Sequence, residues 1–441
     1  MTTLPRTQRY RAARLLMAGA ALFGGVCPAG AAPAAIALAP PAATSTQAPT
    51  LVSLDAAIDA AMTENIDVVS ARNAVRTAAA GLRSADTFPN PVLSLGATSL
   101  RTGHVFPDAV SNMADDVARI DQPIERGGKR RARVGSARAS LQAASSDVAD
   151  TQRQVRADVV GAWTDLLAAE QRQALYDGIA ASYRQSQLLA ERRLQAGAIS
   201  AGDLSRQRVE MLRAQSDLSR IASDRREAQL ALAVLIGEEP HAATLQTIGG
   251  WQRPAVNADR DIDTIVSARP DVRAADERIA AARYAYEGAR ALRHPDISIG
   301  AQYEHGGNTP GSSIGFGFSV PLQVGNRYSG EIDSASVDRN QAEANAAKVR
   351  AVATAEIATA RRAAEDASAR RARYDDDLLP SARKAAATAE FAYARGAMAL
   401  VDLLDARRTL LAIALAAIDA HADEAKARAR QAAAETPEET Q

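Results

Sequence analysis

Two glutamates occupy the same position in two similar stretches of this chain. Glu191 and Glu390 are 199 residues apart, and each lies six residues before a glycine that ends a long alanine-rich run. Arg192, Arg193 and Arg395 lie close by in the sequence and could form ion pairs with these acids between helices. The alternative is that both glutamates are solvated residues on a helix surface.

The similarity between the two stretches extends beyond the glutamates. A Gly-x5-Asp-Leu motif occurs in both, again offset by 199 positions: Gly197, Asp203 and Leu204 in the first copy, Gly396, Asp402 and Leu403 in the second. Glycine permits a tight turn between two helices, and aspartate can cap the helix that returns. The sequence therefore predicts a tandem duplication of a unit made of strands, a long helix, a turn and a return helix.

The residue types that enzymes and tight metal sites need are scarce. The five histidines show no metal-ligand spacing, and the single cysteine is Cys27. No grouping of serine, histidine and aspartate indicates a catalytic site. The formal net charge is +0 and the sequence pI is about 7.0, which argues against a nucleic-acid-binding protein. We therefore expect no cofactor, no metal site and no enzymatic activity.

The first residues have the pattern of a secretory signal peptide. Four arginines precede an apolar stretch from Leu15 to Val26, and Ala29-Gly30-Ala31 fits the cleavage rule. We expect residues 1–31 to be removed on export and residues 32–50 to form a flexible lead-in. Cys27 is either removed with this peptide or acylated, as in a lipoprotein.

Helix patterns divide the rest of the chain into two repeats and a connector. The predicted ranges are 51–236 for the first repeat, 237–260 for the connector, 261–426 for the second repeat and 427–441 for a polar, frayed tail. Ser53 to Thr87 is predicted as one helix with Ser53 as its N-cap. Lys129 to Gln195 contains no proline, and a helix of that length would extend ~100 Å. Pro380 interrupts the corresponding run in the second copy.

Short alternating segments predict a β-hairpin in each repeat. In the second hairpin the apolar side chains share one face and small or polar side chains share the other; the apolar set includes Ile297, Ile299, Ile314, Phe316 and Phe318. Apolar residues facing lipid are typical of an outer-membrane barrel, whereas an ordinary half-buried hairpin would also alternate. Four strands are too few to close a barrel, so three copies would have to share twelve strands or four copies sixteen.

Together these features resemble the TolC family of outer-membrane channel-tunnel proteins. The resemblance covers about residues 51 to 430 and rests on the duplication, on the prolines that stop the helix before each hairpin, and on the two helical turns. Gln122-Pro-Ile-Glu-Arg-Gly-Gly-Lys-Arg-Arg-Ala-Arg133 is similar to the cobalt–zinc–cadmium (CzcC-like) branch. Val320-Pro-Leu-Gln-Val-Gly-Asn-Arg327 is a shortened form of that branch's second motif.

The resemblance implies a mainly α fold with a small β part, in the cell outer membrane with a long periplasmic portion. A homotrimer would form a twelve-stranded barrel in the outer-membrane lipid and a helical tunnel below it. The tunnel would dock onto a periplasmic adaptor of an inner-membrane RND-type exporter through the two Gly-x5-Asp-Leu turns. Glu191 and Glu390 would lie near the aperture with Arg192 and Arg395. We expect the tip to open when the second-copy helix pair moves outward on docking.

The expected function is a passive duct that exports heavy-metal cations. A duct for type I protein secretion or drug efflux is an alternative, because the turns do not reveal the cargo. An exported coiled-coil scaffold without a pore is another, although it would not need apolar outward faces. The basic run Lys129-Arg130-Arg131 with Arg133 either binds lipid phosphates at the inner leaflet or is a solvated helix start.

Overall fold

The computed structural model describes residues 49–98, 115–252, 260–306 and 311–435. These residues belong to one compact unit, Ala48–Gln441. The predicted signal peptide, Cys27, nearly all of the lead-in and the end of the tail lie outside the described residues. In the part of the chain that is described, no helix combines the length and the apolar character that a membrane span requires.

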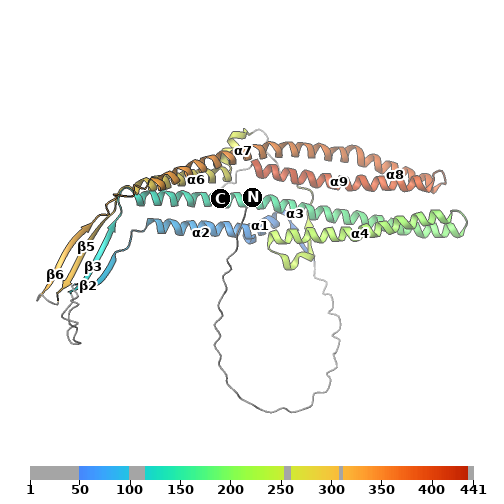
Figure 1. Ribbon diagram of the computed structural model, residues 1–441. Coiled ribbons are helices and arrows are strands. Elements are labelled where there is room, and N and C mark those ends of the chain that lie inside the picture. Colours follow the sequence, from blue (N-terminus) through green and yellow to red (C-terminus); the bar gives the residue numbers. More distant parts are fainter. Residues whose placement is uncertain (1–48, 99–114, 253–259, 307–310, 436–441) are drawn as a thin grey trace, which may run out of the picture. The chain divides into compact units, whose positions relative to one another are not determined.

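The first half of the unit holds one long helical hairpin and the first pair of long strands (Figure 1). Its elements are β1 (Thr50–Ser53), α1 (Leu54–Glu64), α2 (Ile66–Asp86), β2 (Val92–Thr98), β3 (Asp115–Ile124), α3 (Lys129–Gln195), α4 (Ala201–Ile236), the 3₁₀ helix η2 (Glu239–Thr244) and β4 (Leu245–Ile248).

The second half repeats this pattern with a second pair of strands and a second helical hairpin (Figure 1). Its elements are α5 (Ile262–Ala268), α6 (Pro270–Ala291), β5 (Ile297–His305), β6 (Ser312–Ser319), α7 (Ser329–Arg373), the π-helical turn η3 (Tyr374–Leu378), α8 (Leu379–Ala394) and α9 (Leu400–Glu435).

The predicted long helix is present in full. Helix α3 has 67 residues, with the bounds expected from the proline-free run. In the second copy the helix is interrupted by η3, just before Pro380. Proline has no N–H to donate and its ring crowds the preceding turn, so the wider π turn accommodates it.

The predicted N-terminal helix is divided into two. Ser53 caps α1 as expected, because its Oγ accepts a hydrogen bond from the N–H of Ala56 at 3.2 Å. Helix α1 then ends before Asn65, whose side chain caps α2 and also donates to the carbonyl of Leu235 at 3.1 Å. Two helices therefore replace one, since Asn65 is extended and fixed to α4.

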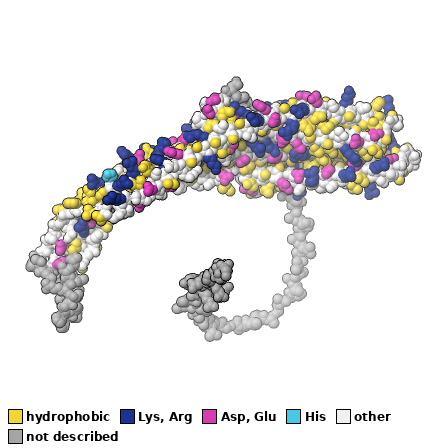
Figure 2. Space-filling model, turned by 45° about the horizontal axis from the view of Figure 1, so that its top comes forward, with side chains coloured by type: hydrophobic (Ala, Val, Ile, Leu, Met, Phe, Trp, Pro, Cys, Tyr) yellow, Lys and Arg dark blue, Asp and Glu magenta, His cyan; other side chains and the backbone are white. Residues whose placement is uncertain are grey.

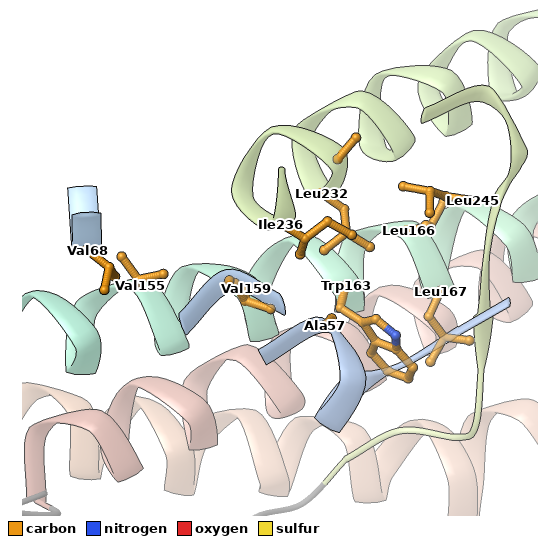
Figure 3. Packing of buried hydrophobic residues seen from close by; sticks show 12 residues of the cluster. Ala57, Val68, Val155, Val159, Trp163, Leu166, Leu167, Leu232, Ile236 and Leu245 are labelled. Carbon is orange, nitrogen blue, oxygen red and sulfur yellow. The ribbon is translucent and has the colours of Figure 1, made fainter. Parts of the chain in front are cut away.

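A second sheet was not foreseen from the sequence. Strand β1 pairs in parallel with β4, so the lead-in ends in a strand at Thr50 and the connector contains one. Both strands adjoin the largest buried cluster, which surrounds Trp163 (Figure 3). The indole of Trp163 is fully buried and donates to the carbonyl of Val52 at 3.1 Å.

The predicted frayed tail is wrong for its first nine residues. Helix α9 continues to Glu435, which is 4% exposed and forms an ion pair with Arg361 of α7 at 2.8 Å. Alanines on the inner face of this last stretch are buried as well, which holds it against its neighbours.

The four longer strands form one antiparallel sheet in the order β2-β3-β5-β6. The sheet lies at the end of the unit opposite to the α3–α4 and α8–α9 turns (Figure 1). Ile299 pairs with Phe318, Ala301 with Phe316, and Tyr303 with Ile314. The apolar residues of the second hairpin therefore share a face, as the alternation predicted.

Candidate functional site

Both helical turns have the backbone that their glycines permit. Gly197 has φ +71° and Gly396 has φ +75°, in the left-handed region that favours glycine. In the first turn the N–H of Ala198 donates to the carbonyl of Arg193 at 2.8 Å. The N–H of Ala397 donates to the carbonyl of Ala392 in the second. These bonds close each helix end with a Schellman-type turn.

The two aspartates do not cap the return helices as expected. Asp203 is the third residue of α4, and the cap is Ser200, whose Oγ accepts from the N–H of Asp203 at 3.1 Å. Ser200 also donates to the Asp203 carboxylate at 2.9 Å. Asp402 is likewise the third residue of α9. Both carboxylates instead complement the positive end of a helix dipole.

The helical hairpins pack against each other above the turns. The buried residues of this contact are Tyr183, Ala214, Ala389, Leu400, Leu403 and Leu404. Leu403 is only 4% exposed, so its side chain belongs to the core between the hairpins. Leu204, its counterpart in the first turn, is half-buried, and both glycines are exposed. Of the residues predicted to contact an adaptor, Leu403 has the least exposed side chain.

An ionic clamp, which we define as Glu210, Glu390, Arg407 and Arg408, joins the hairpins beside this core. Arg408 of α9 donates from Nε to Glu210 of α4 at 3.2 Å and contacts the same carboxylate through Nη2. Arg407 holds Glu390 of α8 at 2.9 Å and donates to Ser186 of α3 at 3.3 Å. The clamp therefore connects α9 to both α3 and α4.

At one end of the clamp, the Glu210 carboxylate is buried. The Glu210 side chain is 8% exposed, and its hydrogen bond raises the pKa of Arg408 above the ordinary value. Burial, with the nearby Glu210 charge, also raises the pKa of Tyr183. A carboxylate that is removed from water this far needs its cationic partner, so loss of Arg408 would weaken the contact between the hairpins.

The predicted partners of the aperture acids are wrong. Glu390 is paired with Arg407, and Arg395 instead stacks on the ring of Phe391, 4.0 Å from its centroid. Glu191 accepts from Gln187 at 3.0 Å. Arg192 is exposed. Spacing alone missed Arg407, because it lies about two turns into the return helix and not at the loop.

The apolar face of the sheet is open to the outside. Phe316 is 85% exposed, Phe318 77%, Ile314 73% and Ile299 54%, whereas Ile297 is half-buried. The register places Leu93 and Leu95 of β2 on the same face through Ile120 and Ala118 of β3. The opposite face is polar and includes an Arg119–Asp121 ion pair at 2.7 Å. A row of aromatic side chains exposed to water costs free energy. This face therefore requires contact with an apolar environment.

A charged substitution on this face tests whether the face contacts lipid. We expect Phe316→Arg to cost about 2–4 kcal/mol if the residue faces lipid near the bilayer centre, and to lower the yield of protein in outer membranes. Ser313→Arg is the matched control, since Ser313 lies on the same strand and the opposite face. Equal outer-membrane yields for the two variants would contradict the lipid-facing assignment.

Within the described residues, no three His, Cys, Asp or Glu side chains are grouped closely enough to hold a metal ion. The described residues instead form two candidate sites: the ionic clamp near one end of the unit and the exposed apolar face of the sheet at the other end.

Comparison with known proteins decides the family. Residues 57–238 and 262–435, most of the chain, match the outer membrane efflux protein family. The chain belongs to that family. It is therefore an outer-membrane efflux channel, a passive duct and not an enzyme, with the TolC-like channel-tunnel fold.

The efflux channel has relatives along most of its length. It is 27% identical to the cobalt-zinc-cadmium resistance protein CzcC of Cupriavidus metallidurans, over 81% of this chain and 84% of that protein. It is 25% identical to the pyoverdine export outer membrane protein OpmQ of Pseudomonas aeruginosa, over 83% and 81%.

Solved structures share its fold. CusC gives a TM-score of 0.75 at 19% identity, covering 86% of this chain and 91% of that chain. The outer membrane protein VceC of Vibrio cholerae gives 0.71 at 20% identity, covering 86% and 95%.

Proposed function

We propose that three copies of this chain form one continuous duct, whose twelve strands close into a shared sheet in the outer membrane. The observation that supports this is the exposed apolar face of a sheet with two free edges, β2 and β6. Successive strands of the sheet are antiparallel, so β6 of one copy would meet β2 of the next in antiparallel orientation. Closure would leave no strand edge in lipid.

The helical end would contact a periplasmic adaptor, which joins the duct to an inner-membrane RND-type exporter. Gly197, Asp203, Gly396 and Asp402 are exposed or half-buried there and available for contact. The two turns differ at their surface: the exposed Val401 replaces Gly202, so the second turn is the more apolar. They would therefore meet different parts of the adaptor.

The cargo that we propose is divalent heavy-metal cations. This rests on the similarity to CzcC, and on acidic residues near the tip. Deleting the gene should lower the zinc, cobalt or cadmium concentration that permits growth, and a plasmid copy should restore it. Sensitivity to a siderophore or drug without any change in metal tolerance would support the alternative cargo and overturn this one.

We propose that Glu390 and Glu191 contribute carboxylates to the aperture of the trimer. Glu390 is about half exposed and shares its charge with Arg407, whereas Glu191 has no cationic partner among the described residues. Charge reversal at Glu390 should lower cation selectivity in planar bilayers, since it also frees Arg407. The reversal potential under a salt gradient measures this, with Glu365→Lys on the exposed surface of α7 as the control. An unchanged reversal potential for Glu390→Lys would remove it from the aperture.

A further inference from the structure

A junction band lies where the helices meet the four-stranded sheet. We define it as residues 86–91, 125–133, 292–296 and 320–328, the segments by which the chain crosses between helix and strand. Polar contacts hold these segments together: Gln122 donates to the carbonyl of Pro89, and Gln323 to that of Leu292, each at 2.9 Å. Lys and Arg side chains are prominent beside the sheet in Figure 2.

Most of the basic side chains in residues 129–133 form ion pairs within the chain. Lys129 pairs with Asp296 at 2.8 Å, Arg130 with Asp86 at 2.5 Å, and Arg133 with Glu125 at 2.6 Å. Three acids of the band are thereby neutralised. These three cations hold the crossings together, so they are not free to bind a ligand.

Four other arginines of the junction band remain without an ion pair among the described residues. Arg126, Arg131, Arg293 and Arg327 are exposed, and none forms an ion pair with a carboxylate of the described residues. Glu331, in the first turn of α7, is the nearest acid after Arg327 in the sequence. The band therefore keeps an excess of positive charge on every copy of the chain.

Exposed apolar side chains accompany these arginines. Val324 is 90% exposed, Leu322 82% and Phe88 70%. Phe88 precedes β2 and the other two follow β6, so they lie beside both outer strands of the sheet. Arginine extends its charge toward water or phosphate while its stem covers apolar surface, which suits the boundary between hydrocarbon and headgroups.

We propose that the junction band binds anionic phospholipid headgroups of the inner leaflet of the outer membrane. The apolar sheet face places hydrocarbon beside the strands, and the band follows directly toward the helices, at headgroup depth. Arg126, Arg131, Arg293 and Arg327 bind the phosphates, and Leu322 and Val324 insert among the upper acyl carbons. This rests on the proposed membrane-spanning sheet and adds a lipid class that fixes its depth.

The test compares lipid retention by the full-length protein purified in detergent. Phosphatidylglycerol and phosphatidylethanolamine are added in equal amounts, and bound lipid is counted by native mass spectrometry. Each basic residue at a membrane surface contributes roughly fivefold in affinity for anionic lipid. Replacing all four arginines by glutamine should lower the preference for phosphatidylglycerol by about tenfold or more. The pairs Arg126/Arg131 and Arg293/Arg327 are also replaced separately, in case the fourfold variant does not assemble.

The matched control removes the same charge elsewhere, with Arg72, Arg76, Arg208 and Arg383 changed to glutamine; all four are exposed on the helices. Equal lipid preference in the two fourfold variants would overturn the proposal. Full displacement of the bound lipid by inorganic phosphate would overturn it too, because that would indicate a phosphate site. If the wild-type protein conducts ions in bilayers but shows no lipid preference, the inference fails while the duct stands; a protein that never enters the outer membrane contradicts the duct itself.

Discussion

We expect replacement of Arg408 by glutamine to favour an open tip in the proposed duct. The change leaves the buried Glu210 carboxylate without its partner from α9, while Arg213 still contacts it at 3.2 Å from the same helix. A hydrogen bond to a charged group contributes about 1.5–3 kcal/mol, so the ratio of open to closed states should rise by about tenfold or more. The readout is the fraction of time that single channels spend in a high-conductance state in planar bilayers.

The clamp supplies its own controls. Arg213→Gln removes a cation from the same carboxylate without separating α4 from α9, so it should leave conductance almost unchanged. Exchanging the charges in Glu210→Arg with Arg408→Glu should restore the closed state in part. If Arg213→Gln opens the channel as much as Arg408→Gln, the effect belongs to the carboxylate itself, and the contact between hairpins does not hold the tip shut.

The second large effect is expected at Arg269, which joins α6 to α7. Its side chain is 2% exposed and binds Asp271 at 2.7 Å and Glu356 at 2.8 Å. Arg269→Met leaves Asp271 partly buried without its cation, and breaking such a pair costs about 3–5 kcal/mol. Thermal unfolding of the purified protein should show this loss. Arg278→Met is the control, because its pair with Asp147 is exposed and contributes about 1 kcal/mol or less.

The ion pair between Arg269 and Asp271 also predicts how the free energy of unfolding depends on pH. Burial alone would raise the pKa of Asp271, but the hydrogen bonds and charge of Arg269 outweigh it and hold the pKa below its ordinary value of 3.8. The stabilisation is therefore complete above that value and is lost as the pH falls through the lower folded-state pKa. Arg269→Met should remove this acid-dependent part, so the wild-type and variant unfolding temperatures should converge in strong acid.

The regular parts of the fold could be predicted because they depend on local pattern. The proline-free run gave the bounds of α3, and strict alternation gave the shared face of Ile299, Phe316 and Phe318. Glycine at 197 and 396 predicted the turns, since a left-handed backbone requires it. These features are determined by residues that are neighbours in the sequence.

Contacts between distant segments could not be predicted in the same way. Strand β1 pairs with β4 across almost 200 residues, and neither has an alternating pattern long enough to indicate a strand. Arg407 and Arg408 are two among many arginines of the helices, and only their position opposite Glu390 and Glu210 makes them partners. Arg395 stacks on the ring of Phe391, whereas sequence spacing predicts it as the partner of Glu390.

In the proposed assembly, three copies of this chain enclose one water-filled path through the outer membrane. The most direct test is to determine the mass of the detergent-purified particle, corrected for bound detergent, and to record its single-channel conductance in a planar bilayer from the same preparation. We expect a mass of three chains and discrete conductance steps that respond to Arg408→Gln. A stable monomer or dimer, or trimers that never conduct even with the clamp removed, would contradict the account.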